Sequence, residues 1–123
     1  MEEIGIESTL VEAIKNKDKT IEIRLGKPRF LRIQEDDILS VREDFWYERK
    51  VLESLPHALE IRITQILYFE TIKEAAEAID FQAAVPTAQS VDDVVTKYRE
   101  FYTPKDEAEY GVVVFSFELV TKP

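Results

Sequence analysis

The feature that most constrains the fold is the strict alternation of polar and apolar residues in the segment Thr20–Leu25. Successive side chains of a strand point to opposite faces, so this pattern predicts a strand with one face turned towards a core. The apolar face consists of Ile21, Ile23 and Leu25. Glu22 and Arg24 are two residues apart and leave the strand together from the opposite face. The segment therefore predicts a sheet that holds two charged groups side by side.

The remaining apolar patterns predict further strands and several helices. Further strands are predicted over residues 37–42, 57–69 (with a bend) and 112–119. A first helix is predicted over residues 7–15, with Ser8 or Thr9 as its N-cap and Glu12 completing a capping box with Thr9. Later helices are predicted from Thr71 to Ile79, with Glu74 completing a second capping box, from Ser90 to about Tyr102, and from Thr103-Pro104 to Gly111. Acidic residues at 92–93 and 106–107 are interpreted as helix-start charges.

Residues 43–56 give no single prediction. Weak helical periodicity from Glu48 to Leu55 ends at Pro56, so the segment fits either a helix or an ordered loop. The cluster Phe45-Trp46-Tyr47 cannot turn all three rings inward from a strand, so at least one ring is expected to be exposed. Around Trp46 the cluster can serve as a lid, as a protein contact, or only as a loop folded over one end of the domain.

Length and composition bound the class of protein. A chain of 123 residues fits one domain, residues 1–123. Cysteine is absent, and His57 is the single histidine with no second ligand near it, so no metal site and no cofactor are expected. No apolar run is long enough to span a membrane, and the acidic start Met1-Glu2-Glu3 is unlike a signal peptide. We therefore expect a cytoplasmic protein without a membrane partner.

The charge is distributed unevenly along the chain. The whole sequence carries −9, yet the segment from Lys15 to Arg32 carries a local +5 and includes Lys19, Arg24 and Lys27. Such asymmetry fits one basic face that receives an anion on an otherwise acidic body. The alternative is a set of solvated side chains on a turn and an edge strand.

One set of residues resembles a known family. Lys19, Glu22 and Arg24, at spacings of three and two after a helix and a turn, resemble the signature of the ASCH domain family. Lys17 stands where the family usually has Gly, and Asp36-Asp37 where it usually has Gly-Asp. The C-terminal part also resembles the family's ending, through Tyr98-Arg99, Phe101-Tyr102, Glu107, Tyr110-Gly111 and Val112–Leu119.

The resemblance implies an α+β fold, a PUA-like small mixed β-barrel with flanking helices, and a cleft lined by the signature strand and the first helix. It implies RNA, a nucleotide or a nucleoside as ligand. Some family members hydrolyse an amide on a modified cytidine, and another branch is reported to cut RNA. Lys19 matches the functional Lys of the amidohydrolase branch, whereas Glu22 stands where that branch has Thr, and its catalytic Glu has no match between Thr71 and Ser90.

Three hypotheses follow for the function. In the first, Lys19, Glu22, Arg24 and Lys27 form a binding cleft in which Arg24 offers a donor fork and Glu22 accepts from an amino group. In the second, Lys19 is the catalytic group of a small hydrolase. In the third, the segment around Trp46 binds a protein. The non-functional alternative for Lys19, Glu22 and Arg24 is a surface ion-pair ladder worth at most about 1 kcal/mol.

Tyrosines near the C-terminus are further candidates. Tyr98 and Tyr102 lie on one face of a helix, and with Tyr110 they can either stack on a base or pack in the core. The sequence leaves open whether the protein is an enzyme, which ligand it takes and its oligomeric state.

Overall fold

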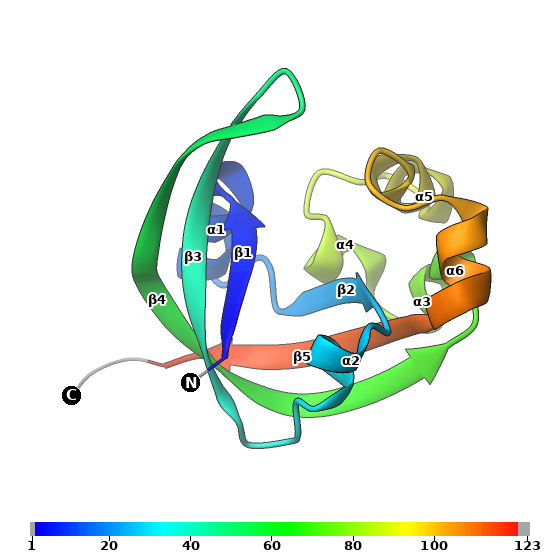
Figure 1. Cartoon of the computed structure of the whole chain (residues 1–123), viewed down its shortest axis with the longest axis horizontal. Coiled ribbons are helices and arrows are strands. Elements are labelled where there is room, and N and C mark those ends of the chain that lie inside the picture. The colour runs from blue at the N-terminus through cyan, green and yellow to red at the C-terminus, as the bar shows by residue number, and fades with distance from the viewer. Residues whose placement is uncertain (1, 121–123) are drawn as a thin grey trace.

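A curled five-stranded sheet with helices packed around it forms the domain in a computed structural model, which describes residues 2–120 (Figure 1). The strands are β1 (Glu3–Glu7), β2 (Ile21–Leu25), β3 (Ile38–Tyr47), β4 (Lys50–Phe69) and β5 (Val112–Leu119). Their order in the sheet is β1-β3-β4-β5-β2. β1 pairs with β3 in parallel, and the other three pairings are antiparallel. The expectation of a mixed α+β fold with a small, barrel-like sheet is confirmed at this level.

The sheet buries two separate cores because β5 is apolar on both faces. Val113, Phe115 and Phe117 pack into one core with β1, β3 and α1. Val112 and Val114 pack into a second core with the helices that follow β4. Strand β2 lies at the edge beside β5, where Ile23 joins the second core. The edge strand that carries Glu22 and Arg24 therefore lies between the two packed halves of the molecule (Figure 1).

Local signals explain most of the helices. Their bounds are α1 (Ser8–Lys15), α2 (Pro28–Leu31), α3 (Ile72–Ala78), α4 (Phe81–Ala84), α5 (Val91–Arg99) and α6 (Pro104–Tyr110). Thr71 and Ser90 cap α3 and α5 through their side chains, as expected. Thr103 and Asp106 form a reciprocal capping box with Pro104 at the first turn of α6.

The expected cap of the first helix is wrong. Glu7 is the N-cap of α1 and makes no side-chain cap, while the hydroxyl of Thr9 donates to the Glu7 carboxylate at 2.7 Å. The helix begins directly after β1, so its start is set by the end of that strand. Glu107 lies in the first turn of α6 as expected, and it is also buried and accepts hydrogen bonds from Arg99 and from the backbone N–H of Ile72.

Residues 43–56 form neither a helix nor an irregular loop. β3 runs to Tyr47 and β4 begins at Lys50, so the segment is a long hairpin that projects from the sheet (Figure 1). Register shifts interrupt the pairing between Val41 and Glu43 and between Phe45 and Trp46. β4 is exposed on both faces near the hairpin turn, so its sequence there has no two-residue periodicity. The weak helical periodicity of this segment therefore does not indicate a helix.

Candidate functional site

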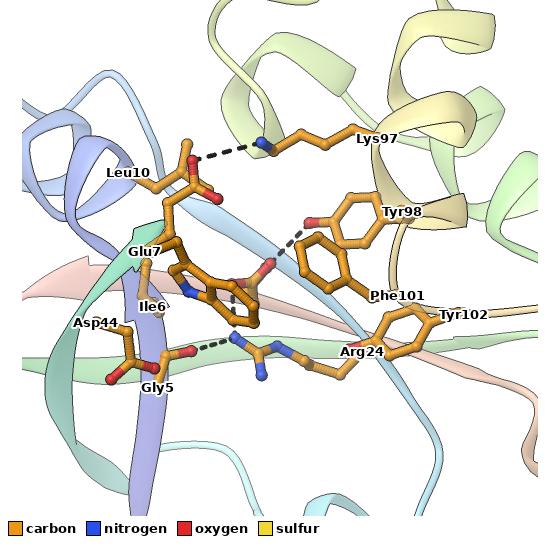
Figure 2. Close-up of a pocket in the computed structure, with 12 residues that line it drawn as sticks. Gly5, Ile6, Glu7, Leu10, Arg24, Asp44, Lys97, Tyr98, Phe101 and Tyr102 are labelled. Carbon is orange, nitrogen blue, oxygen red and sulfur yellow. Dashed lines mark hydrogen bonds and ion pairs between the residues drawn. The ribbon is translucent and has the colours of Figure 1, made fainter. Parts of the chain in front are cut away.

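A cavity of about 190 Å³ opens between the two halves of the molecule, above Glu22 and Arg24 of β2 (Figure 2). One side is formed by β1, the start of α1 and β3, and the other by α5 and the residues after it. The lining residues are Gly5, Ile6, Glu7, Leu10, Glu22, Arg24, Asp44, Trp46, Lys97, Tyr98, Phe101 and Tyr102. Segments distant in sequence therefore meet over the predicted signature strand.

Glu22 is the most constrained polar group of this site. Its Oε1 accepts from the hydroxyl of Tyr98 at 2.8 Å and from the backbone N–H of Ile23 at 3.0 Å. Its Oε2 accepts from Nη2 of Arg24 at 3.2 Å. The ammonium of Lys19 lies 3.6 Å from Oε1, although Lys19 itself does not line the cavity. The side chain of Glu22 is only 4% exposed, so its position is fixed before any ligand arrives.

These contacts keep Glu22 ionised. Burial by itself raises the pKa of Glu22, but the charges of Lys19 and Arg24, with the hydrogen bonds from Tyr98 and Ile23, bring it to about 2. Burial and the neighbouring Glu22 charge raise the pKa of Tyr98 well above its usual value, so its hydroxyl remains a donor. The floor of the cavity thus presents a carboxylate acceptor at neutral pH.

Arg24 presents donors beside that acceptor. Its Nη2 donates hydrogen bonds to the carbonyl oxygen of Gly5, at 2.6 Å, and to the carboxylate of Glu22. Its Nε and Nη1 have no hydrogen-bond partner within residues 2–120, and the side chain is 19% exposed at the cavity. Burial opposes the charge, but Glu22 more than offsets this and the pKa of Arg24 is raised. Arg24 also lies over the ring of Phe30, 5.7 Å from its centre, which supports the guanidinium.

Aromatic rings form much of the wall. Tyr98 and Tyr102 stack with a centroid distance of 6.2 Å and an interplanar angle of 12°. Trp46, from the hairpin, meets Phe101 edge to face at 5.5 Å. Trp46 and Phe101 are both exposed, at 41% and 44%, whereas Tyr98 is buried. The expectation that at least one ring of the cluster at residues 45–47 is exposed is confirmed, since Trp46 and Tyr47 both are.

Charges around the cavity are nearly balanced. Glu7 pairs with Lys97 at 3.5 Å across the cavity, and Glu22 pairs with Arg24 (Figure 2). Asp44 pairs with Arg42, outside the lining, at 2.7 Å. Burial raises the pKa of Asp44, but the hydrogen bonds from Arg42 and Ser54 lower it below its ordinary value. Each acid therefore has a basic partner, and the cavity has no excess positive charge to attract a phosphate.

The structure separates the predicted site residues into two groups. Glu22, Arg24, Tyr98 and Tyr102 line the cavity together. Lys19 is buried beneath it, with its ammonium donating to the carbonyls of Ile21 and Ala84, both at 2.6 Å. The interpretation of a surface ion-pair ladder is wrong, because the Lys19 side chain is fully buried and that of Glu22 nearly so.

Two other predicted residues lie outside the lining. Lys27 is exposed beyond the end of β2, 5.5 Å from the ring centre of Tyr110, and Tyr110 contributes to that contact and not to the cavity. Sequence reasoning missed Gly5, Asp44, Lys97 and Phe101. No local pattern marks these residues, because they reach the site only through the parallel pairing of β1 with β3 and through the packing of α5.

Within residues 2–120, no group of three or more His, Asp or Glu side chains is placed to hold a metal ion. Among the helices of the described residues, none has the combined length and apolar character that a membrane crossing needs.

Comparison with known proteins gives structural neighbours. No protein-family model matches the sequence, and no curated protein matches it. The crystal structure of hypothetical protein PH0355 aligns with a TM-score of 0.81 and 27% identity, over 98% of this chain and 100% of that one. The NMR structure of protein PF0455 from Pyrococcus furiosus aligns with a TM-score of 0.73 and 26% identity, over 98% of each chain.

A more distant neighbour shares the fold alone. Protein EF3133 from Enterococcus faecalis V583, described as a DUF984 protein, aligns with a TM-score of 0.60 and 14% identity, over 92% of this chain and 68% of that one. The chain therefore has the fold of a group of small proteins, two of which match it along almost their whole length.

Proposed function

We propose that this protein is a binding module of the ASCH type, with a PUA-like fold, that receives one base of an RNA, nucleotide or nucleoside above Glu22 and Arg24. The observation that carries the proposal is the pairing of an acceptor and a donor on one cavity floor. Glu22 and Arg24 line a cavity of about 190 Å³ together with the aromatic residues Trp46, Tyr98, Phe101 and Tyr102, and Nε and Nη1 of Arg24 have no hydrogen-bond partner within residues 2–120. A base edge presents the complementary donors and acceptors, and its ring suits such walls.

The charge balance supports a neutral ring and not a phosphate as the buried group. Every acid that lines the cavity has a basic partner, and the protein as a whole carries −9. A polyanion would gain little from such a surface. The volume also lies below the roughly 300–1,000 Å³ of drug-sized sites, which fits a single ring with the remainder of the ligand outside.

The alternative is a small hydrolase in which Lys19 reacts. The ammonium group of Lys19 donates hydrogen bonds to two carbonyl oxygens and forms an ion pair with Glu22. Lys19 does not line the cavity. A nucleophile must reach the substrate atom that it attacks, so this position supports a structural role for Lys19. The binding module is therefore the function that we propose.

Titration calorimetry with the four ribonucleosides and their monophosphates tests the proposal. We expect one nucleoside to bind with saturation, because the base makes the contacts that we propose. Arg24→Lys keeps the charge but removes the planar fork, so it should weaken binding by about tenfold or more. The matched control is Arg62→Lys, on β4 and paired with Glu118 outside the cavity, which should bind as the wild type does. Equal affinities for the two variants would contradict the proposal.

A further inference from the structure

A second concavity adjoins the first on the outer side of the aromatic pair Trp46–Phe101. Its volume is about 350 Å³, and it is lined by Glu7, Trp46, Arg49, Glu100 and Phe101. Three of these residues, Glu7, Trp46 and Phe101, also line the inner cavity. The two concavities therefore meet at this pair, and a group that leaves the inner cavity there enters the outer one.

The shared pair offers ring surface to both sides. Trp46 comes from the hairpin and Phe101 from the segment after α5, and their rings meet edge to face at 5.5 Å. Both side chains are more than two-fifths exposed although they contact each other. Exposed aromatic side chains at the mouth of a cavity form a stacking surface that tolerates any base.

The outer concavity differs from the inner one in its charged groups. Arg49, at the hairpin turn with φ of +67°, forms no ion pair within the part of the chain that the structure describes. Lys97 neutralises Glu7, so Glu100 is the other acid that lines the outer concavity. The outer concavity thus presents one cation, Arg49, and one acid, Glu100, outside any ion pair of the described residues, so a ligand phosphate is favoured only beside Arg49.

We propose that the outer concavity is a second subsite, so that the ligand is a single-stranded dinucleotide unit and not an isolated nucleoside. This rests on the proposed function: the first base enters the inner cavity, the neighbouring base stacks on the outer side of Trp46 and Phe101, and Arg49 contacts the phosphodiester between them. A single phosphate contact predicts a weak salt dependence, with a slope of log K against log salt of about −0.7.

Calorimetry with the four ribonucleosides and their dinucleoside monophosphates tests this second subsite. We expect the dinucleoside monophosphate that carries the preferred base to bind roughly 5- to 150-fold more tightly than the nucleoside, as one additional stacked base allows. Its affinity should fall with added salt, whereas that of the nucleoside should not. Arg49→Gln should remove the salt dependence and part of the gain, and Lys50→Gln, the next residue along the chain but outside the concavity, should change neither.

The outcomes separate the two proposals. If a nucleoside binds and depends on Arg24, but its dinucleoside monophosphates bind no more tightly, the second subsite is wrong and the binding module stands. If Arg49→Gln and Lys50→Gln reduce the salt dependence equally, Arg49 makes no specific phosphate contact and the second subsite is likewise wrong. If neither nucleosides nor dinucleoside monophosphates bind, both proposals are wrong.

Discussion

At the scale of single residues, the site depends on how Glu22 is held. A carboxylate removed from water is stable only when donors and opposite charges surround it, and Glu22 has both. Tyr98 therefore has a polar role as well as a packing role: it is buried with its ring in the second core and its hydroxyl on Glu22. Of the two interpretations of Tyr98 from the sequence, packing is confirmed, while ligand contact stays a prediction for this cavity-lining residue.

Tyr98→Phe should destabilise the protein by about 1.5–3 kcal/mol, because it removes a hydrogen bond to a charged, buried group. The free energy of unfolding in urea measures the loss. Tyr102→Phe is the matched control, since the Tyr102 hydroxyl has no hydrogen-bond partner within residues 2–120, and it should change stability by less than about 0.5 kcal/mol. Equal losses in the two variants would contradict a stabilising hydrogen bond from the Tyr98 hydroxyl to Glu22.

The pKa of Glu22 predicts a pH dependence of stability. Folding lowers this pKa from its ordinary 4.5 to about 2, so the folded state favours the ionised form. The stabilisation is fully present above pH 4.5 and is lost as the pH falls towards 2. Its size is about 3 kcal/mol, as a pKa difference of this order implies.

Urea midpoints between pH 2 and pH 6 test this dependence. Wild type should lose more stability on acidification than Glu22→Gln, because the amide does not titrate. Parallel profiles for the two proteins would contradict the assignment of the low pKa to Glu22.

At the scale of elements, the sequence predicts those structures whose signals are local. β2 and β5 were predicted from alternation and from an apolar run, and α3, α5 and α6 from their capping residues. β1 was missed, because a five-residue strand paired in parallel with a distant strand has no turn signal beside it. For the same reason the β1 and β3 side of the candidate site, including Gly5 and Asp44, could not be predicted.

The N-terminal ends of α6 and α1 allow a comparison between a helix with a side-chain cap and a helix without one. Thr103→Ala removes a side chain that caps α6 and should cost about 1 kcal/mol. Thr9→Ala should change stability by less than about 0.5 kcal/mol, because Thr9 lies within α1 and does not cap it. Denaturation of both variants beside the wild type measures the difference. A larger loss for Thr9→Ala would contradict the structure of the start of α1.

At the scale of the whole molecule, the candidate site is a cavity that lies between two hydrophobic cores. One core holds β1, β3 and α1, the other holds the helices after β4, and the cavity lies between them above β2. Arg24 ties the halves together through the Gly5 carbonyl, and Lys97 does so through Glu7. The ligand that we propose would fill this cavity, so its binding should also raise the free energy of unfolding by mass action.

An amide NMR titration with the four ribonucleosides tests the proposed base-binding site. We expect saturable shifts for one of them at the backbone N–H groups of Glu22 and Arg24 and at the indole N–H of Trp46, the single tryptophan of the chain. These shifts should need about tenfold or more ligand to saturate in Arg24→Lys and should be unchanged in Arg62→Lys. Shifts that spare β2 and Trp46, or that are the same in both variants, would contradict a base-binding site above Glu22 and Arg24.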